Sequence, residues 1–255
     1  MITAGIDIGS ISTKAVLLKD GEILAQCVIF TGYSAEAAGR TAFAGALAQA
    51  KLDSANLERI VATGYGRKSV SFAARSVTEI ACHAAGAHFQ NPAVRSVIDI
   101  GGQDSKAMVL NDRGGVENFV MNDKCAAGTG RFLEVMARAL EADLSAFGEL
   151  SARARKPARI SSLCTVFAES EVVSAIAKGE AREDIVAGIH EAIAARIASM
   201  AQRIGVRAPL MMTGGVARNP GVVQAVGKSL GLPVLTTPHA QINGALGAAI
   251  LARSA

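Results

Sequence analysis

The sequence predicts an α/β protein built from two related lobes, each with a largely buried β-sheet covered by helices. Three observations support this fold class. Half of the 255 residues are hydrophobic and only 19% are charged, which is typical of a folded chain rather than a disordered one. Segments with a strand pattern alternate with segments of helical periodicity. A stretch near the N-terminus also occurs a second time further along the chain.

The repeat consists of two segments of equal length. "IDIGSISTKAVLLKD" begins at Ile6 and "IDIGGQDSKAMVLND" begins at Ile98, and eight of their fifteen positions are identical without a gap. Each segment reads as a strand ending in Asp-Ile-Gly, a short polar turn and a second strand, which is a hairpin pattern. "GEILAQCVIF" and "GGVENFVM" follow the two copies and are expected to add a third strand to each. We interpret the pair as a duplication.

The remaining elements follow in order along the chain. After the first copy, residues 34–50 have a helical pattern, residues 57–64 have a strand pattern, and another helix is expected around Cys82. After the second copy, the pattern predicts helices near 128–140, 143–155, 167–178 and 182–204. A strand at 208–215 and a helix from about Asn219 come next.

The two copies imply two domains. We place the boundary near Pro92, which divides the chain into an N-terminal lobe of residues 1–92 and a C-terminal lobe of residues 93–255. The lobes are expected to face each other across a cleft. The last helix, about 240–253, is a candidate to pack back against the first lobe.

Composition and charge exclude several classes of protein. The net charge of +4 and pI near 9.0 are mild, and no basic run is interleaved with aromatic residues, so nucleic acid is not a predicted partner. The N-terminal "MITAGIDIGS" lacks the pattern of a signal peptide, and no apolar run is long enough to span a membrane. Four widely spaced cysteines do not form the disulfide framework of a secreted protein. We therefore expect a cytoplasmic protein with reduced thiols and no membrane partner.

The turn of each hairpin has the composition of a phosphate-binding loop. Glycine lets the backbone approach a phosphate closely, and hydroxyl, amide and N–H groups donate hydrogen bonds to it. The candidate phosphate-binding residues are Ser10, Ile11, Ser12, Thr13 and Lys14 in the first hairpin and Gly102, Gln103 and Asp104 in the second. Gln103 or Asp104 is the candidate catalytic residue that orients an attacking water.

Two carboxylates precede these turns. Asp7 ends the first predicted strand and Asp99 ends its repeat. Because carboxylates facing a polyphosphate would be repulsive alone, they imply Mg²⁺, usually held through water.

Two glycine-rich elements occur later in the chain. "MMTGGVARNPG" places Gly214 and Gly215 between a strand and a helix, where the backbone can pack against a nucleoside and the helix N-terminus favours an anion. "HAQINGALGAAI" places Gln241 just before the last helix. The chain contains neither a GxxxxGK[ST] loop nor a GxGxxG after a strand. Each turn alone is a weak signal, and the alternative is that all four are structural turns of an inert protein.

Together, the duplicated Asp-x-Gly hairpins and the late Thr-Gly-Gly element resemble the superfamily of actin, Hsp70 and sugar kinases. The resemblance covers the whole chain. It implies a duplicated, two-lobed actin-like (ribonuclease H-like) ATPase fold, with ATP or ADP and Mg²⁺ bound in the cleft between the lobes. The candidate phosphate-binding residues, with Gly214, Gly215 and Gln241, then become candidate ATP-binding residues.

Two cysteines stand before predicted helices. Cys125 precedes "AAGTGRFLEVMARAL" and Cys164 precedes "TVFAESEVVSAIAKG". That position favours a thiolate, because the partial positive charge of a helix N-terminus stabilises an anion. Free cysteines are most often small buried hydrophobic residues, and a disulfide does not suit a reducing compartment. The third interpretation is a metal site, for which two thiolates are half of what zinc or a [4Fe–4S] cluster requires; a homodimer would supply the other half. Cys27 and Cys82 are expected in the core.

The motifs then narrow the resemblance to one family. "ATGYGR", "IDIGGQDSK", "MNDKCAAGTGRFL", "SSLCTVFAESEV", "AGIH", "MTGGVARN" and "NGALGAA" resemble, in this order, the activator component of 2-hydroxyacyl-CoA dehydratases. The resemblance implies that Cys125 and Cys164 ligate one [4Fe–4S] cluster shared by a homodimer. It also implies that ferredoxin or flavodoxin donates an electron, which passes to a separate dehydratase when ATP is hydrolysed.

Three alternatives remain. The nearest is an ATP-binding subunit of a benzoyl-CoA-type reductase, which belongs to the same group. The others are a metal-free sugar kinase and a non-catalytic nucleotide-binding scaffold.

One further segment is strongly basic. "ARARKPAR", residues 152–159, carries Arg153, Arg155, Lys156 and Arg159. Such a segment is normally a solvated loop. Because it lies shortly before Cys164, attraction of an acidic electron carrier is a second interpretation.

Overall fold

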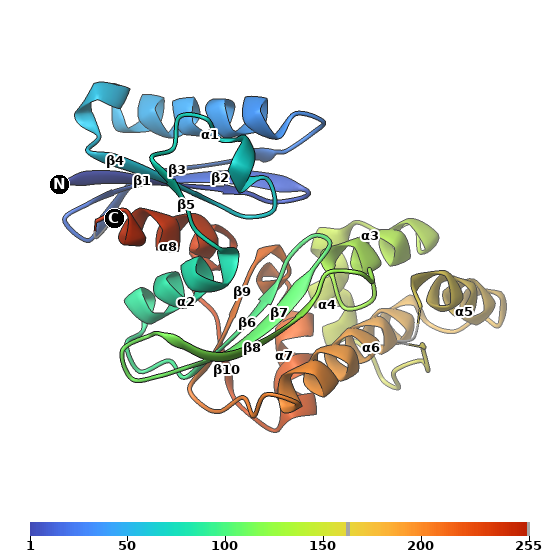
Figure 1. The fold of residues 1–255 in the computed structure, drawn as a ribbon. Helices are drawn as coiled ribbons and strands as arrows, with labels where there is room; N and C mark the ends of the chain where they lie inside the picture. The colour runs from blue at the N-terminus through green and yellow to red at the C-terminus, as the bar shows by residue number, and fades with distance from the viewer. Residues whose placement is uncertain (162–163, 254–255) are drawn as a thin grey trace. The chain divides into compact units, whose positions relative to one another are not determined.

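The computed structural model describes residues 1–161 and 164–253. In this part of the chain the strands form two five-stranded sheets, with the orders β3-β2-β1-β4-β5 and β10-β9-β6-β7-β8. Read from its other edge, the second sheet has the order β8-β7-β6-β9-β10, so every strand of the first sheet has a counterpart in the second (Figure 1). The predicted duplication therefore extends from the two hairpins to the complete sheets.

The first sheet is a hairpin ribbon joined to two parallel strands. It consists of β1 (Ile2–Ile8), β2 (Ser12–Lys19), β3 (Glu22–Phe30), β4 (Arg59–Thr63) and β5 (Arg75–Ser76). β1, β2 and β3 are antiparallel neighbours, whereas β4 runs parallel to β1. The register places Asp7 opposite Lys14, and the turn closes with a hydrogen bond of 3.1 Å from the Gly9 N–H to the Ser12 carbonyl.

Helices cover both faces of the first sheet (Figure 1). Alternate residues of β2 explain why: Leu17 packs in the cluster that holds Phe43 of α1 (Ala35–Ala50), whereas Leu18 packs with Leu246 of α8 (Asn243–Leu251). α2 (Glu79–Gln90) packs against α8. Although α8 follows the second sheet in the chain, it packs on the first sheet and covers one side of its core.

The second sheet consists of β6 (Ser96–Ile100), β7 (Ser105–Leu110), β8 (Val116–Asn122), β9 (Leu210–Thr213) and β10 (Val234–Leu235). Every residue of β6, β7 and β9 is buried. The helices that follow are α3 (Gly130–Ala139), α4 (Phe147–Ala152), α5 (Thr165–Ala177), α6 (Arg182–Gln202) and α7 (Pro220–Leu230). α6 packs on α4 and α7, and α5 packs on α3.

Contacts divide the chain into two compact units. The first contains Met1–Val97, Leu110–Glu117 and the residues from Thr237 onward; the second contains Ile98–Val109 and Asn118–Thr236. Short 3-10 helices occur at Ser54–Asn56, Arg67–Ser69, Leu144–Ala146, Gly215–Arg218 and Ala240–Ile242. Among the described residues, no helix is both long and apolar enough to cross a membrane.

The predicted helix near 143–155 was wrong in extent. Asp143 accepts a hydrogen bond from the Ser145 N–H and starts a 3-10 turn, and α4 then ends at Ala152. The helix stops there because Asp184, distant in sequence, accepts the N–H groups of Arg155 and Lys156. The short strands β5 and β10 were not predicted.

Candidate functional site

The end of β1 holds a carboxylate in a tight cradle. Asp7 is 6% exposed, and its Oδ2 lies 3.2 Å from the Lys14 Nζ on the facing strand. Gly64, which follows β4, has a φ of +84°, and a Cβ there would lie 2.3 Å from Asp7 Oδ1. A Cβ at Gly244 would lie 3.1 Å from Asp7 Oδ2. Both positions leave room for the Asp7 carboxylate because they are glycines; a side chain at either position would push the carboxylate aside.

The end of β6 repeats this arrangement. Asp99 is 2% exposed, its Oδ2 lies 3.2 Å from the Lys106 Nζ, and its Oδ1 accepts a hydrogen bond of 3.0 Å from Thr213. Lys106 Nζ also lies 2.9 Å from Asp104 Oδ2. Gly214 has a φ of +89°, and a Cβ there would lie 2.7 Å from Asp99 Oδ1. Each half of the chain thus brings one buried carboxylate, one lysine and one glycine together.

The glycine at the end of the fourth strand is a part of the repeat that the sequence analysis missed. β4 ends in Thr63 followed by Gly64, and its counterpart β9 ends in Thr213 followed by Gly214. The only available signal was the dipeptide Thr-Gly after an apolar strand in each half. Two residues are too short a match to identify without the register of the sheets.

Within the first unit, the candidate ATP residues Ser10, Ile11, Ser12, Thr13 and Lys14 form the turn and following strand of one hairpin, and Gln241 lies in the 3-10 helix before α8. The Thr13 side chain is fully buried and shares a hydrogen bond of 2.9 Å with Thr31. Thr31 in turn donates to the Gly9 carbonyl at 2.8 Å. Thr13 therefore stabilises the hairpin internally, and its hydroxyl does not face solvent as expected for a phosphate ligand.

Within the second unit, the turn of the repeated hairpin holds Gly102, Gln103 and Asp104, and Gly214 and Gly215 follow β9. Asp104 is half-buried and paired with Lys106, whereas Gln103 is exposed. The two candidate catalytic residues therefore have different surroundings. Only Gln103 presents a side chain to solvent without an ionic partner.

The two candidate cluster cysteines are free and half-buried, and both belong to the second unit. Cys164 is the N-cap residue of α5. Cys125 does not begin a helix: the turn of residues 126–129 separates it from α3, whose N-cap is Thr129. Within the described ranges 1–161 and 164–253, no three His, Cys, Asp or Glu side chains gather as a metal site.

Hydrogen bonds connect the Cys125 segment to the second hairpin. The Asn122 side-chain amide donates to the carbonyls of Cys125 at 2.8 Å and Ala127 at 3.2 Å. At the start of α3, the Gly130 N–H donates to the Gly101 carbonyl at 2.9 Å and the Arg131 N–H to the Gly102 carbonyl at 2.8 Å. Two N–H groups in the first turn of α3, which have no partner within the helix, thus donate to the loop that carries Gln103.

Both other cysteines were predicted in the core, but only Cys82 is buried, and Cys27 is half-buried at the edge of the core. Cys82 is fully buried, and burial raises the pKa of its thiol to about 12. Cys27 packs against the cluster beneath α1, and a Cβ at Gly45 would lie 2.6 Å from its Sγ.

One histidine has a structural role. His190 on α6 is 2% exposed, and its Nε2 lies 3.2 Å from the amide nitrogen of Asn219. Asn219 caps α7 by accepting hydrogen bonds from Gly221 and Val222. Burial lowers the pKa of His190 to about 4, so the ring is neutral when it holds this cap.

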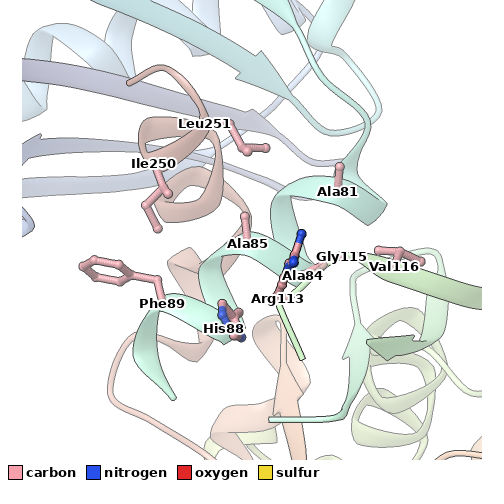
Figure 2. Close-up of a pocket in the computed structure, with 11 residues that line it drawn as sticks. Ala81, Ala84, Ala85, His88, Phe89, Arg113, Gly115, Val116, Ile250 and Leu251 are labelled. Atoms are coloured by element: carbon pink, nitrogen blue, oxygen red, sulfur yellow. The ribbon is translucent and has the colours of Figure 1, made fainter. Parts of the chain in front are cut away.

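A pocket of about 520 Å³ lies in the first unit between α2, α8 and the turn before β8 (Figure 2). Its walls are mainly apolar, including Phe89, Ile250 and Leu251, with His88 and Arg113 as polar side chains. It contains none of the candidate residues and has no charge arrangement suited to a nucleotide. We do not assign it to the ATP site.

Comparisons with known proteins agree on one family. A model of the BadF/BadG/BcrA/BcrD ATPase family matches residues 4–252. The chain is 50% identical to the activator of lactoyl-CoA dehydratase from Anaerotignum propionicum, over 100% of this chain and 98% of that protein.

Solved structures give the same result. The (R)-2-hydroxyglutaryl-CoA dehydratase component A of Acidaminococcus fermentans is 46% identical, with a TM-score of 0.96 and coverage of 100% of this chain and 98% of that chain. The activator of 2-hydroxyisocaproyl-CoA dehydratase from Clostridium difficile, solved with bound ADPNP, is 44% identical, with a TM-score of 0.95 and coverage of 100% and 95%. More distant sugar kinases share the fold alone. The predicted two-lobed actin-like ATPase fold is confirmed.

Proposed function

The chain belongs to the BadF/BadG/BcrA/BcrD ATPase family, and on that premise we propose that it is the ATP-hydrolysing activator of a 2-hydroxyacyl-CoA dehydratase. The observation that carries the proposal is the near-complete match, at 50% identity, to an activator of lactoyl-CoA dehydratase. The ATPase activity follows from the family. Each hairpin carries one Asp–Lys pair, and these are the kinds of charged groups expected at a polyphosphate-binding site.

Nucleotide binding is assigned to the two hairpins and the glycines after β9. Lys14 and Lys106 provide positive charge at the hairpins, and Asp7 and Asp99 would hold Mg²⁺ through water. Gln103 is the better candidate to orient the attacking water, because Asp104 is engaged by Lys106. Gly214 and Gly215 would lie against the nucleoside.

Cys125 and Cys164 fit the ligand set of a [4Fe–4S] cluster shared between two copies of the chain. Both thiols are free and half-buried, and each chain supplies two of the four thiolates that such a cluster needs. α5, which begins at Cys164, leaves Val166, Phe167, Val173 and Ile176 at least 44% exposed, an apolar surface suited to a second copy. When bound, the cluster would supply one-electron transfer at low potential.

The electron would come from ferredoxin or flavodoxin and pass to the dehydratase when ATP is hydrolysed. The nucleotide can drive this transfer only if it interacts differently with two conformations of the protein. The hydrogen bonds from the Gly101–Gly102 turn to the start of α3 give the second hairpin a direct connection to the Cys125 segment. A shift of that turn would therefore move the start of α3, which follows Cys125 by five residues.

The test combines metal analysis with nucleotide binding in anaerobically purified protein. Cys125→Ser and Cys164→Ser should each abolish the brown chromophore and weaken the dimer, while the affinity for ADP stays at the wild-type value. Cys27→Ser is the matched control, because Cys27 is also free and half-buried but belongs to the first unit. Mutants with full iron would contradict the cluster assignment.

The same preparation separates the alternatives. A reductase subunit would purify only with its partner subunits, and a sugar kinase would be colourless and phosphorylate a small alcohol. A scaffold would bind ATP without turnover. A wild-type protein without iron would remove the electron-transfer proposal but not the ATPase.

A further inference from the structure

A cluster of exposed positive charges lies on the chain just before Cys164. Arg153, Arg155, Lys156 and Arg159 are all exposed in the segment between α4 and α5, and we refer to these four residues as the basic loop. In the part of the chain that the structure describes, none of the four side chains has an acidic partner. Asp184, whose carboxylate accepts two N–H groups of the loop, contributes one negative charge against four positive charges, so the loop keeps a net positive charge.

The backbone of the basic loop is held on the start of α6. Asp184 Oδ1 accepts hydrogen bonds from the N–H groups of Arg155 at 2.7 Å and Lys156 at 3.0 Å, and its carbonyl accepts the Ala158 N–H at 2.9 Å. Gly188 allows this packing, because a Cβ there would lie 2.1 Å from the Ala158 carbonyl oxygen. The backbone of the loop is therefore anchored to α6, and its four cationic side chains extend into solvent from a fixed position.

The loop is also tied to the helix of the candidate cluster cysteine. The Ser161 N–H donates to the Glu171 carboxylate on α5, whose N-cap is Cys164. Arg159 precedes Cys164 by five residues, a stretch that spans at most about 18 Å when fully extended. A protein bound to the basic loop is thus held close to Cys164.

We propose that the basic loop is the docking surface for the electron donor, a small protein with an acidic face. The proposal rests on the electron-transfer function proposed above and adds the surface that receives the donor. Transient redox encounters use small interfaces and depend on charge for their rate, which suits four cations on one short segment. A fixed backbone reduces the ordering cost of binding. Nucleic acid is a poorer occupant, because no aromatic side chain interrupts the run.

The experiment measures two quantities with an acidic ferredoxin as the probe. The first is the affinity of ferredoxin for the activator, titrated without dehydratase; the second is the rate at which reduced ferredoxin reduces the activator in stopped flow. The double variant R155E/K156E retains the backbone N–H groups that Asp184 binds. A second variant, R153E/R159E, changes residues whose N–H groups Asp184 does not bind, and it serves if the first fails to fold. Iron content and melting temperature report folding for each.

The matched control is a single charge reversal far from the basic loop. Lys156→Glu is compared with Arg203→Glu, because Arg203 is also exposed and caps the C-terminus of the 21-residue α6, about 30 Å from the start of the helix where the loop is bound. At low ionic strength, the double variant should slow reduction by about tenfold or more, and added salt should slow the wild type toward the variant. Lys156→Glu should also slow reduction, whereas Arg203→Glu should behave as wild type.

The outcomes separate the two proposals. Equal affinities and rates for wild type and both double variants would overturn the docking surface. A normal reduction rate with slower electron delivery to the dehydratase would also overturn it, because the loop would then serve the other partner. If the wild type contains no iron but binds ferredoxin through the loop, the docking surface stands and the electron-transfer function fails.

Discussion

Gly214 allows the cradle around Asp99 to be tested by a single methyl group. Its φ of +89° and ψ of 176° lie in a region open essentially to glycine, where another residue costs about 1–3 kcal/mol. An alanine Cβ would also lie 2.3 Å from the Ile100 carbonyl oxygen, in a buried strand that cannot move aside, and such overpacking costs about 1–3 kcal/mol. Gly214→Ala should therefore destabilise the protein by about 4 kcal/mol, the middle of the summed range.

Gly215→Ala is the control, because a Cβ at Gly215 would meet nothing within 4 Å. For a chain of this size, the loss at Gly214 corresponds to a fall in melting temperature of about 8–16 °C, whereas Gly215→Ala should melt close to the wild type. Thermal unfolding of the nucleotide-free protein, followed by circular dichroism, measures both. The reasoning fails if Gly214→Ala melts within 2 °C of the wild type (about 0.5–1 kcal/mol), or if Gly215→Ala loses as much.

Three further predictions follow from buried groups. Lys106→Met leaves Asp99, whose side chain is 3% exposed, without its cation, and should lower the free energy of unfolding in urea by about 3–5 kcal/mol; an unchanged midpoint would contradict this. Because burial raises the pKa of Cys82 to about 12, iodoacetamide at pH 8 should modify Cys125 in folded, iron-free protein and spare Cys82, as peptide mass spectrometry would show. Because burial lowers the pKa of His190 to about 4, the unfolded state takes up the proton first. The contribution of His190 to the free energy of unfolding should be fully present above pH 6.5 and fall by up to about 3 kcal/mol as the pH drops toward 4. His190→Asn should reduce this dependence of the free energy of unfolding on pH. An equal slope in the variant would assign the acid sensitivity to other groups.

Much of the fold could be predicted because its signals are local. The strand before Asp7 and its repeat before Asp99 were read from their apolar runs and identical turns, and the structure has β1 and β6 there. The helix before Lys51 was read from the helical pattern of residues 34–50, and the structure has α1 there. Patterns of this kind depend only on neighbouring residues.

Other features could not be read because distant residues create them. The helix predicted near 143–155 ends at Ala152, since Asp184 captures the following N–H groups. Thr13 was expected to face a phosphate, but its hydroxyl shares a hydrogen bond with Thr31, just after β3, and is buried. Neither partner is marked in the sequence as belonging to that site.

By itself, the sequence determined the duplicated hairpins, the order of most helices and strands, and the identity of the two cysteines that precede α3 and α5, because repeats, periodicity and turn chemistry are written in adjacent residues. Only the tertiary structure decided that Gly64 and Gly214 complete the carboxylate cradles and that Asp184 fixes the basic loop. Each of these depends on the register of strands or the packing of helices, which brings together atoms that the chain keeps far apart.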